Sequence, residues 1–267
     1  MQVLSHFCHA DARIRPVPPD RVRFPLPPQA TRGKGKGKLV DQILAFQRAG
    51  IENLLVVGPA GCGKTTCARL AAEALDRPFV LIPCNLGTPA YTFTGRRHPI
   101  TGEYQDTEFT EAYKGNGKGF VILLDDFDRL DPGISATLHS ALENGSLATP
   151  VGSIPRHRDT LIIATGNNWG NGADRLYVAS NQQDAATLRR FEGGRIAAEY
   201  DADYEDQYDA EVVAYCRKAR KHIDARKLRR VVSTGMIKKC CKHKLAGNDW
   251  KAQVTADWSD QEREGLQ

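Results

Sequence analysis

A glycine-rich segment that ends in a lysine and a threonine follows a run of apolar residues near residue 60. The segment consists of Gly58, Pro59, Ala60, Gly61, Cys62, Gly63, Lys64 and Thr65. This spacing fits the pattern G-x-x-x-x-G-K-[ST]. Apolar residues 54–57 come before it and the helix-forming residues 65–75 follow it, so we expect a strand, a loop and a helix in that order. In this context the motif predicts a site for the phosphates of a nucleoside triphosphate.

The chemistry of such a loop depends on its main chain and on two polar side chains. Glycines let the backbone turn tightly, so successive N–H groups point toward phosphate oxygens, and the helix that follows begins with a partial positive charge. We expect Lys64 to bind the β- and γ-phosphates and Thr65 to offer its hydroxyl to Mg²⁺. Thr66 completes the predicted nucleotide-binding residues. The sequence has no guanine-selective N-K-x-D pattern, so the predicted cofactors are ATP and Mg²⁺.

A pair of carboxylates follows another apolar run. Residues 121–124 are Val-Ile-Leu-Leu, and Asp125 and Asp126 come directly after them. We expect this order to place the carboxylates at the C-terminal edge of a sheet, opposite the phosphate loop. Asp125 is then predicted to hold Mg²⁺, through water, and Asp126 to orient or deprotonate the attacking water. The alternative is that the two acids only begin a turn.

Four short apolar runs predict the strands of one sheet. They are residues 54–57, 79–82, 120–124 and 161–164. Each run is apolar at successive positions, as expected for parallel strands that helices cover on both faces. Residues 39–49 predict a further helix, and residues 99–104 predict a small hairpin inside a long insert, 85–118. The sequence therefore predicts an α/β fold with a parallel sheet flanked by helices.

The composition changes along the chain and predicts four parts. Residues 1–37 form an extension rich in proline and glycine, 38–198 form the nucleotide-binding α/β domain, 199–250 form a small helical lid domain, and 251–267 form a loose tail.

The predicted lid is highly charged. It carries six acids from Asp201 to Glu211 and then twelve cations from Arg217 to Lys244. Apolar residues in both stretches have helical spacing, and we expect the second helix to begin at Ser233 or Thr234. The cations leave a DNA-dependent ATPase open as an alternative function. Few aromatic residues lie among them, so base stacking has little support and nucleic acid is not the favoured partner.

The remaining composition indicates a cytoplasmic protein with no membrane partner. The net charge is +5, no apolar stretch is long enough to span a bilayer, and the first residues lack the features of a secretory signal. The seven cysteines have no repeated spacing, which indicates reduced thiols rather than disulfides. Cys62 is a candidate redox-sensitive thiol, because a helix N-terminus favours the thiolate; a tolerated small residue is the alternative.

With two further motifs, these residues resemble the AAA+ ATPases, and most closely the MoxR-like group and the ATPase subunit of aerobic cobaltochelatase. The four motifs are residues 58–66, 120–130, 164–167 (Ala-Thr-Gly-Asn) and 188–191 (Leu-Arg-Arg-Phe). The resemblance implies that Asn167 senses the γ-phosphate, although local sequence also fits a simple turn residue. It further implies that Arg190, or else the adjacent Arg189, acts as an arginine finger in the site of a neighbouring subunit.

Two positions differ from the family pattern. The family usually has glutamate where Asp126 stands, and the aspartate is shorter by roughly 1.5 Å, a misplacement that can cost about 10²-fold in rate. Related chains also carry a lid arginine where Gly235 stands. Arg229 and Arg230 are nearby candidates to replace it. We therefore expect slower hydrolysis and weaker lid closure than in related proteins.

The resemblance implies an ATP hydrolase that works as a ring, a hexamer, and remodels a partner protein or a chelatase complex. Asp126, Asn167 and Arg190 are the predicted catalytic residues, and the insert 85–118 is predicted to carry motion to the client. A chelatase partner would contain a metal-ion-binding adhesion-type domain. A nucleotide-gated binding module with little hydrolysis remains an alternative, which the residues Asp126 and Gly235 favour.

Overall fold

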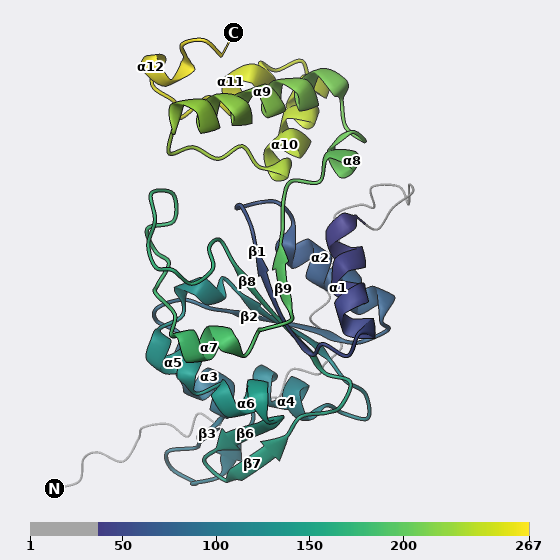
Figure 1. The fold of residues 1–267 in the computed structure, drawn as a ribbon, viewed down its shortest axis with the longest axis vertical. Coiled ribbons are helices and arrows are strands. Elements are labelled where there is room, and N and C mark those ends of the chain that lie inside the picture. The colour runs from purple at the N-terminus through teal and green to yellow at the C-terminus, as the bar shows by residue number, and fades with distance from the viewer. Residues whose placement is uncertain (1–36, 267) are drawn as a thin grey trace, which may run out of the picture. The chain divides into compact units, whose positions relative to one another are not determined.

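The computed structural model describes residues 37–266, and the predicted extension 1–37 lies outside this range except for Gly37 (Figure 1). Five parallel strands form the central sheet in the order β2-β5-β8-β1-β9. They are β1 (Asn53–Val57), β2 (Phe79–Pro83), β5 (Val121–Asp125), β8 (Leu161–Gly166) and β9 (Arg195–Ala197). The four predicted strands are confirmed. The sequence analysis missed β9, because this strand has three residues and only Ile196 among them is buried.

Helices cover both faces of the sheet, and the alternation of strand side chains explains why each strand is apolar throughout. On one face Leu54 and Val56 pack against α1 (Lys38–Arg48) and α2 (Lys64–Ala74). On the other face Leu55 and Val57 belong to a cluster that includes aromatic residues of the helices there. These helices are α3 (Tyr91–Thr94), α4 (Glu108–Lys114), α5 (Pro132–Ala136), α6 (His139–Glu143) and α7 (Ala185–Arg189). The predicted α/β fold with flanking helices is therefore confirmed.

Two hairpins project from the α/β domain. The predicted one is formed by β3 (Arg96–Arg97) and β4 (Tyr104–Gln105), between α3 and α4. Gly95 is required at its start, because its φ is +70° and a Cβ there would lie 2.2 Å from the Tyr104 hydroxyl oxygen. The second hairpin, β6 (Ser146–Thr149) and β7 (Gly152–Pro155), was not predicted. Arg97 of the first hairpin donates to the carbonyl of Pro150 in the second at 3.1 Å.

A separate apolar cluster forms among the second, third and fourth of the five C-terminal helices of the described chain. The five helices are α8 (Ala202–Glu205), α9 (Ala210–Arg226), α10 (Thr234–Leu245), α11 (Trp250–Val254) and α12 (Asp260–Arg263). Of the two candidates, Ser233 is the N-cap of α10, since its hydroxyl accepts the N–H of Met236 at 3.1 Å.

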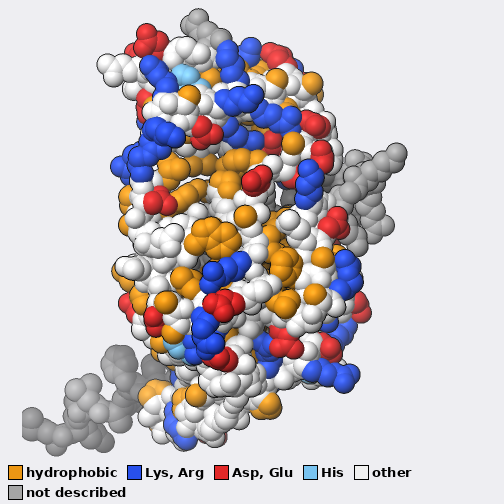
Figure 2. All heavy atoms as spheres, in the orientation of Figure 1, with side chains coloured by type: hydrophobic (Ala, Val, Ile, Leu, Met, Phe, Trp, Pro, Cys, Tyr) orange, Lys and Arg blue, Asp and Glu red, His pale blue; other side chains and the backbone are white. Residues whose placement is uncertain are grey.

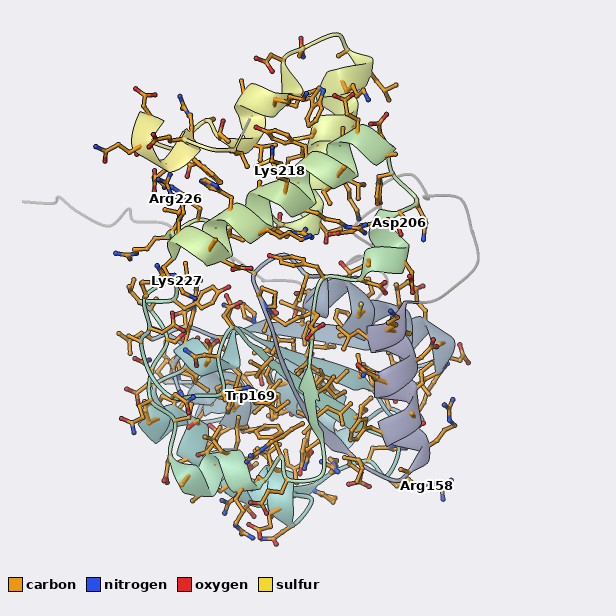
Figure 3. All side chains as sticks on the ribbon, turned by 45° about the horizontal axis from the view of Figure 1, so that its top comes forward. Arg158, Trp169, Asp206, Lys218, Arg226 and Lys227 are labelled. Atoms are coloured by element: carbon orange, nitrogen blue, oxygen red, sulfur yellow. The ribbon has the colours of Figure 1, made fainter. Side chains whose placement is uncertain are left out.

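The prediction of a loose tail after residue 250 is wrong. Val254, Trp258 and Leu266 are buried against α9 and α10, and the ring of Trp258 stacks on His222 with centroids 6.0 Å apart. Arg226, at the end of α9, donates to the carbonyls of Gln261 and Glu264 at 2.6 and 3.0 Å (Figure 3). The tail is ordered because it covers apolar side chains that two long helices leave uncovered.

Among the described residues, no helix is long and apolar enough to cross a membrane. The six described cysteines are free thiols.

We predict that Trp258→Ala lowers the free energy of unfolding of the helical part by about 3 kcal/mol, because it removes a large buried ring. Chemical denaturation followed by far-UV circular dichroism measures the change. The control is Gln253→Ala on α11, where the side chain is exposed and a change below about 0.5 kcal/mol is expected. Equal stability of Trp258→Ala and the control would contradict the packing described for the tail.

Candidate nucleotide-binding site

The phosphate loop connects β1 to α2, and Lys64 is the first residue of α2. The lysine side chain is buried, and its ammonium donates to the carbonyls of Gly58 and Pro59 at 2.7 and 3.2 Å. It also donates to Oδ1 of Asn167 at 3.1 Å. Burial lowers the pKa of Lys64, and the nearby carboxylates partly oppose this effect. The Lys64 ammonium is thus a buried cation whose hydrogen-bond partners are neutral oxygens. Phosphate oxygens can replace these partners, and the negative charge of the phosphate then pairs with the ammonium.

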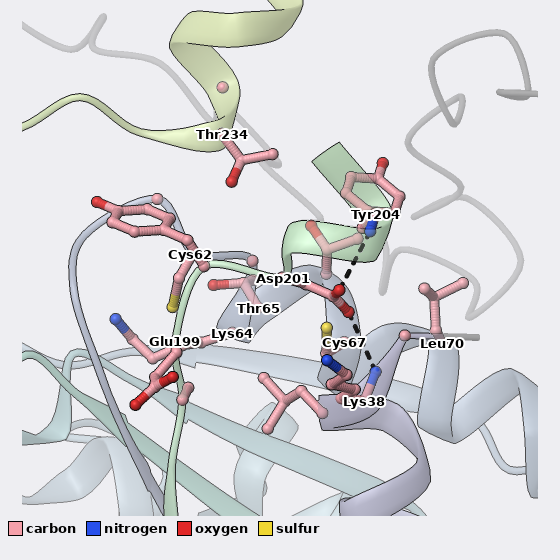
Figure 4. Close-up of a pocket in the computed structure, with 18 of the residues that line it drawn as sticks. Lys38, Cys62, Lys64, Thr65, Cys67, Leu70, Glu199, Asp201, Tyr204 and Thr234 are labelled. Atoms are coloured by element: carbon pink, nitrogen blue, oxygen red, sulfur yellow. Dashed lines mark hydrogen bonds between the residues drawn. The ribbon is translucent and has the colours of Figure 1, made fainter. Parts of the chain in front are cut away.

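A cavity of about 750 Å³ lies beside this loop (Figure 4). Its walls come from four parts of the chain: residues 37–42 at the start of α1, residues 61–70 of the loop and α2, residues 197–204, and the first residues of α10. The volume is in the range found for sites of small molecules and cofactors. Lys38, Lys64 and Lys238 line it together with the acids Glu199 and Asp201, so the cations outnumber the acids by one.

Asp125 lies at the end of β5 and accepts three hydrogen bonds from two hydroxyls. The Thr65 hydroxyl is 3.1 and 3.2 Å from its two carboxylate oxygens, and the Thr165 hydroxyl is 2.6 Å from Oδ1. An adjacent hydroxyl and carboxylate are oxygen donors that fit Mg²⁺, whose other ligands are usually phosphates and water. Thr165 belongs to the motif 164–167, but the motif alone predicts no role for it. Its importance follows only from the pairing of β8 with β5.

Asp126 follows in a left-handed backbone conformation, with φ +56°. Its N–H donates to the Thr165 hydroxyl at 3.1 Å, so this buried threonine contacts both acids. The Asp126 carboxylate is 40% exposed and lies 3.4 Å from the Arg129 guanidinium. Burial raises the pKa of Asp126, and Arg129 partly offsets the rise. The two acids therefore have different environments: one accepts hydroxyls, and the other faces solvent and a cation.

Asn167 follows β8 and is held by a buried carboxylate. Its N–H donates to Oδ2 of Asp128 at 3.2 Å, and Ser180 donates to the same oxygen at 2.7 Å. Asp128 is 2% exposed, and its Oδ1 has no hydrogen-bond partner among the described residues. Asn168, rather than Asn167, makes the local turn bonds, to Gly170 and Gly172. The side chain of Asn167 instead accepts a hydrogen bond from Lys64.

The profile of the AAA domain, dynein-related subfamily, matches residues 53–191, which is just over half of the chain. The chain belongs to this AAA domain family. The family supports nucleotide binding and, in general, ATP hydrolysis, so the predicted AAA+ resemblance is confirmed at that level.

Individual relatives are distant from this AAA protein. It is 29% identical over 156 residues to the ATP-dependent Clp protease ATP-binding subunit ClpL of Staphylococcus aureus (strain bovine RF122 / ET3-1). The aligned residues make up 52% of this chain and 22% of the ClpL chain. The chain thus spans about a fifth of the length of this curated relative. The crystal structure of NtrX from Brucella abortus matches with a TM-score of 0.50 and 15% identity, over 83% of this chain and 54% of that one. At that identity the match shows a shared fold alone.

The two arginines of the predicted finger do not join this site within one AAA chain. Arg190 is 13% exposed at its side chain, lies 3.0 Å from Glu143 and donates to the carbonyls of His139 and Ala186. Arg189 is 55% exposed and pairs with the same glutamate. The hydrogen bond from Arg189 is the main reason that the pKa of Glu143 is lowered. Neither arginine is among the residues that line the cavity.

The structure changes the expectation of which lid cation lies at the cavity of this AAA protein. Arg229 and Arg230 do not line the cavity, and Arg230 pairs with Asp257 and Glu262 at 3.1 and 2.9 Å. Lys238 does line it, one helical turn after Gly235, so this lysine is the lid cation at the cavity. The family pattern did not predict Lys238, because that pattern has its cation, an arginine, at the position of Gly235.

The thiolate predicted for Cys62 is not supported. Burial raises the pKa of the Cys62 thiol, and the nearby Lys64 ammonium only partly opposes this. The desolvation of the thiol outweighs the effect of the helix N-terminus, so the neutral thiol is favoured, and the alternative of a tolerated small residue fits better.

We predict that Thr165→Val weakens the binding of Mg²⁺·ATP by about tenfold and leaves the binding of ATP without Mg²⁺ nearly unchanged. The reason is that Asp125 loses its shortest hydrogen bond. Titration of a fluorescent ATP analogue with and without Mg²⁺ measures both affinities. Thr160→Val is the matched control, since it removes a buried hydroxyl that lies just before the start of β8. The same Mg²⁺ dependence in Thr165→Val and the control would show that Thr165 does not orient Asp125.

Proposed function

We propose that this protein binds Mg²⁺·ATP at the phosphate loop and hydrolyses it in a ring whose neighbouring subunits complete each site. One observation carries this proposal: residues far apart in sequence meet at one edge of the sheet. Lys64 contacts Asn167 at 3.1 Å, and Thr65 contacts Asp125 at 3.1 Å. A binding loop, a candidate metal ligand and a polar sensor are thus combined at one place, as ATP hydrolysis requires.

Each residue has a role that follows from its position. Thr65 and Asp125 would hold Mg²⁺, which when bound neutralises charge on the phosphates. Lys64 would exchange the carbonyls of Gly58 and Pro59 for β- and γ-phosphate oxygens. Asn167 would then orient the attacking water through its amide, since an amide both donates and accepts. Apart from Pro59, which has no N–H, residues 58–63 with Thr66 would supply main-chain N–H groups to the phosphates.

Asp126 would accept the proton of the attacking water. Its carboxylate must first leave Arg129, because the ion pair favours the charged but unreactive orientation. The short side chain and this pair are specific observations in favour of slow hydrolysis. They also favour the second candidate function, a nucleotide-gated binding module that hardly hydrolyses ATP.

We predict that Asp126→Glu raises the turnover of ATP by about tenfold, because the longer side chain moves the carboxylate toward the position usual in the family. Asp126→Asn, which has no basic carboxylate, is expected to bind ATP and to lower turnover by about 10²-fold. Release of inorganic phosphate measures both changes, with Lys64→Ala as the background. Equal turnover in the wild type and Asp126→Asn would exclude Asp126 as the base. A wild-type turnover no higher than that of Lys64→Ala would favour the binding module.

Among the described residues no arginine lines the cavity, and neither do Asp125, Asp126 and Asn167, which lie at the edge of the sheet beside it. We propose that a neighbouring subunit supplies the arginine, as the family resemblance implies. Arg190 and Arg189 both pair with Glu143, at a place from which an outward movement would present a guanidinium to another subunit. We keep Arg190 as the proposed finger and Arg189 as its alternative. The family and the need for a second subunit support a closed ring, for which we propose a hexamer.

The arginine finger can be tested by mixing two inactive variants. Lys64→Ala lacks a working pocket but retains its arginines, and Arg190→Ala retains its pocket. If the finger acts between subunits, an equal mixture regains activity at about a quarter of its sites, because random assembly pairs good pockets with good fingers at that frequency. Phosphate release before and after mixing measures this.

The control for the mixing test is a protein that carries both substitutions. It lacks both the pocket and the finger, so mixing it with Arg190→Ala or Lys64→Ala should leave phosphate release at the background. Full activity of unmixed Arg190→Ala, together with loss in Arg189→Ala, would assign the finger to Arg189. Loss in Arg190→Ala without recovery on mixing would contradict a finger supplied by the neighbour.

We further propose a protein client or partner subunit rather than nucleic acid. The joined hairpins carry exposed apolar side chains at their tips, Ile100 at 89% and Val151 at 51% exposure, and so offer a surface that moves with the insert 85–118. On the face shown in Figure 2, the blue cations of the helical part alternate with red acids. Lys244 pairs with Asp209 and Glu211 within the chain, so part of the charge that suggested DNA binding is neutralised.

The finer assignments remain part of the proposal. They are a place in the MoxR-like or cobaltochelatase group, a partner with a metal-ion-binding adhesion-type domain, a cytoplasmic location, and a division into an α/β domain over 38–198 and a lid that begins at residue 199. The structure extends the helical part to Leu266, so we propose 199–266 for the lid.

A further inference from the structure

A tyrosine that precedes the helical lid contacts the phosphate loop. The hydroxyl of Tyr200 donates to the carbonyl of Ala60 at 3.0 Å. Tyr200 lies between β9 and α8, which is the connection from the α/β domain to the lid, and it lines the cavity. Burial raises the pKa of Tyr200 to about 12, so the hydroxyl remains a donor at neutral pH.

The ring of Tyr200 is held from the lid side by an arginine. The Arg220 guanidinium of α9 lies 3.7 Å from the ring centroid. The same guanidinium donates two hydrogen bonds to Glu205, at 2.9 and 2.7 Å, and one to the Val232 carbonyl at 2.7 Å. Because all three nitrogens of the guanidinium donate hydrogen bonds, the group has one orientation. It therefore fixes the plane of the Tyr200 ring on which it stacks.

The partner of this arginine is a buried acid that also reaches the cavity. Glu205, at the end of α8, is 1% exposed. It accepts the hydroxyl of Thr234, the first residue of α10, at 2.7 Å, and Thr234 lines the cavity. The contacts therefore run without a gap from Thr234 through Glu205, Arg220 and Tyr200 to Ala60.

A second contact places the lid directly on the loop. Gly61 has φ +72°, and a Cβ there would lie 2.4 Å from Cβ of Ser233, the N-cap of α10. Any other residue at 61 would push the lid away. Consecutive residues of the phosphate loop, 60 and 61, thus contact the lid and its connection.

We propose that Tyr200 is a positioning residue for the phosphate loop, and that the Arg220–Glu205 pair sets its position, so that nucleotide affinity depends on the arrangement of the lid. This inference rests on the proposed function, since it requires that the loop binds nucleotide. It predicts that removing the Tyr200 hydroxyl breaks the hydrogen bond to the Ala60 carbonyl, while the ring, its arginine and the contact of Gly61 with Ser233 stay in place.

The chain offers a matched control. Tyr177, on the segment between Asn167 and α7, accepts the N–H of the same residue, Ala60, at 3.0 Å. Tyr177→Phe and Tyr200→Phe each delete one hydroxyl that is bound to Ala60. Only Tyr200 is stacked by the lid arginine, so only Tyr200→Phe should lose the coupling.

The test is a double-mutant cycle on the affinity for a fluorescent ATP analogue. Wild-type binding comes first, and its absence would refute the proposed function rather than this inference. Given binding, we expect Tyr200→Phe and Arg220→Lys each to weaken affinity by about fivefold, and the double variant by no more than either alone. The fold-changes in affinity caused by Tyr177→Phe and Arg220→Lys should instead multiply in the protein that carries both substitutions. Multiplying effects of Tyr200→Phe and Arg220→Lys, or no effect of either, would overturn the proposal.

A second measurement does not depend on how well Arg220→Lys folds. Hydrogen exchange of residues 232–238 with and without saturating ATP reports whether nucleotide binding protects the start of α10. We expect protection in the wild type and in Tyr177→Phe, and clearly less in Tyr200→Phe at the same occupancy. Equal protection in Tyr200→Phe and the wild type would overturn the proposal, because a merely structural tyrosine would not alter this response.

Discussion

The parallel pairing of β8 with β1 on one side and with β5 on the other is the constraint on which the site depends. Val57 lies opposite Gly166, and Leu124 lies opposite Ala164, so the three strands end at the same edge of the sheet. The phosphate loop, the acids and Asn167 follow these ends directly. A slip of one residue in either pairing would turn Thr165 away from Asp125 and remove the contact that joins them.

Polar groups buried next to this edge make the arrangement specific. Thr165 and Asp128 are buried and Asp125 is half-buried, so an unpartnered polar group costs free energy there and each bond they make favours one geometry of the acids and of Asn167. The remaining polar groups are less constrained. Asp126 is partly exposed and paired with Arg129, and the guanidinium groups of Arg189 and Arg190 lie on Glu143. The hydrogen-bonded part of the site, Asp125, Thr165 and Asn167, is therefore suited to binding.

The helical part contributes to the same site rather than merely covering it. The start of α10 and the connection after β9 line the cavity, and Ser233 contacts Gly61. Its own stability comes from a separate apolar cluster that includes Trp258 and Leu266. A lid with its own core can change position without unfolding, whereas contacts through Tyr200 and Arg220 transmit that position to the loop.

Local sequence determined the strands, the phosphate loop, the acids after β5 and the hairpin near residue 100, because apolar runs and glycine spacing restrict the backbone within a few residues. Family resemblance added Asn167 and the arginines. Tertiary structure alone decided the strand β9, the role of Thr165, Lys238 as the lid cation, the packing of Trp258 and the contact of Tyr200 with Ala60. These depend on contacts between distant segments: Thr165 and Asp125 are 40 residues apart, and Tyr200 and Ala60 are 140 residues apart. No local pattern encodes such partners, since burial and register are set only when the whole sheet and the lid have packed.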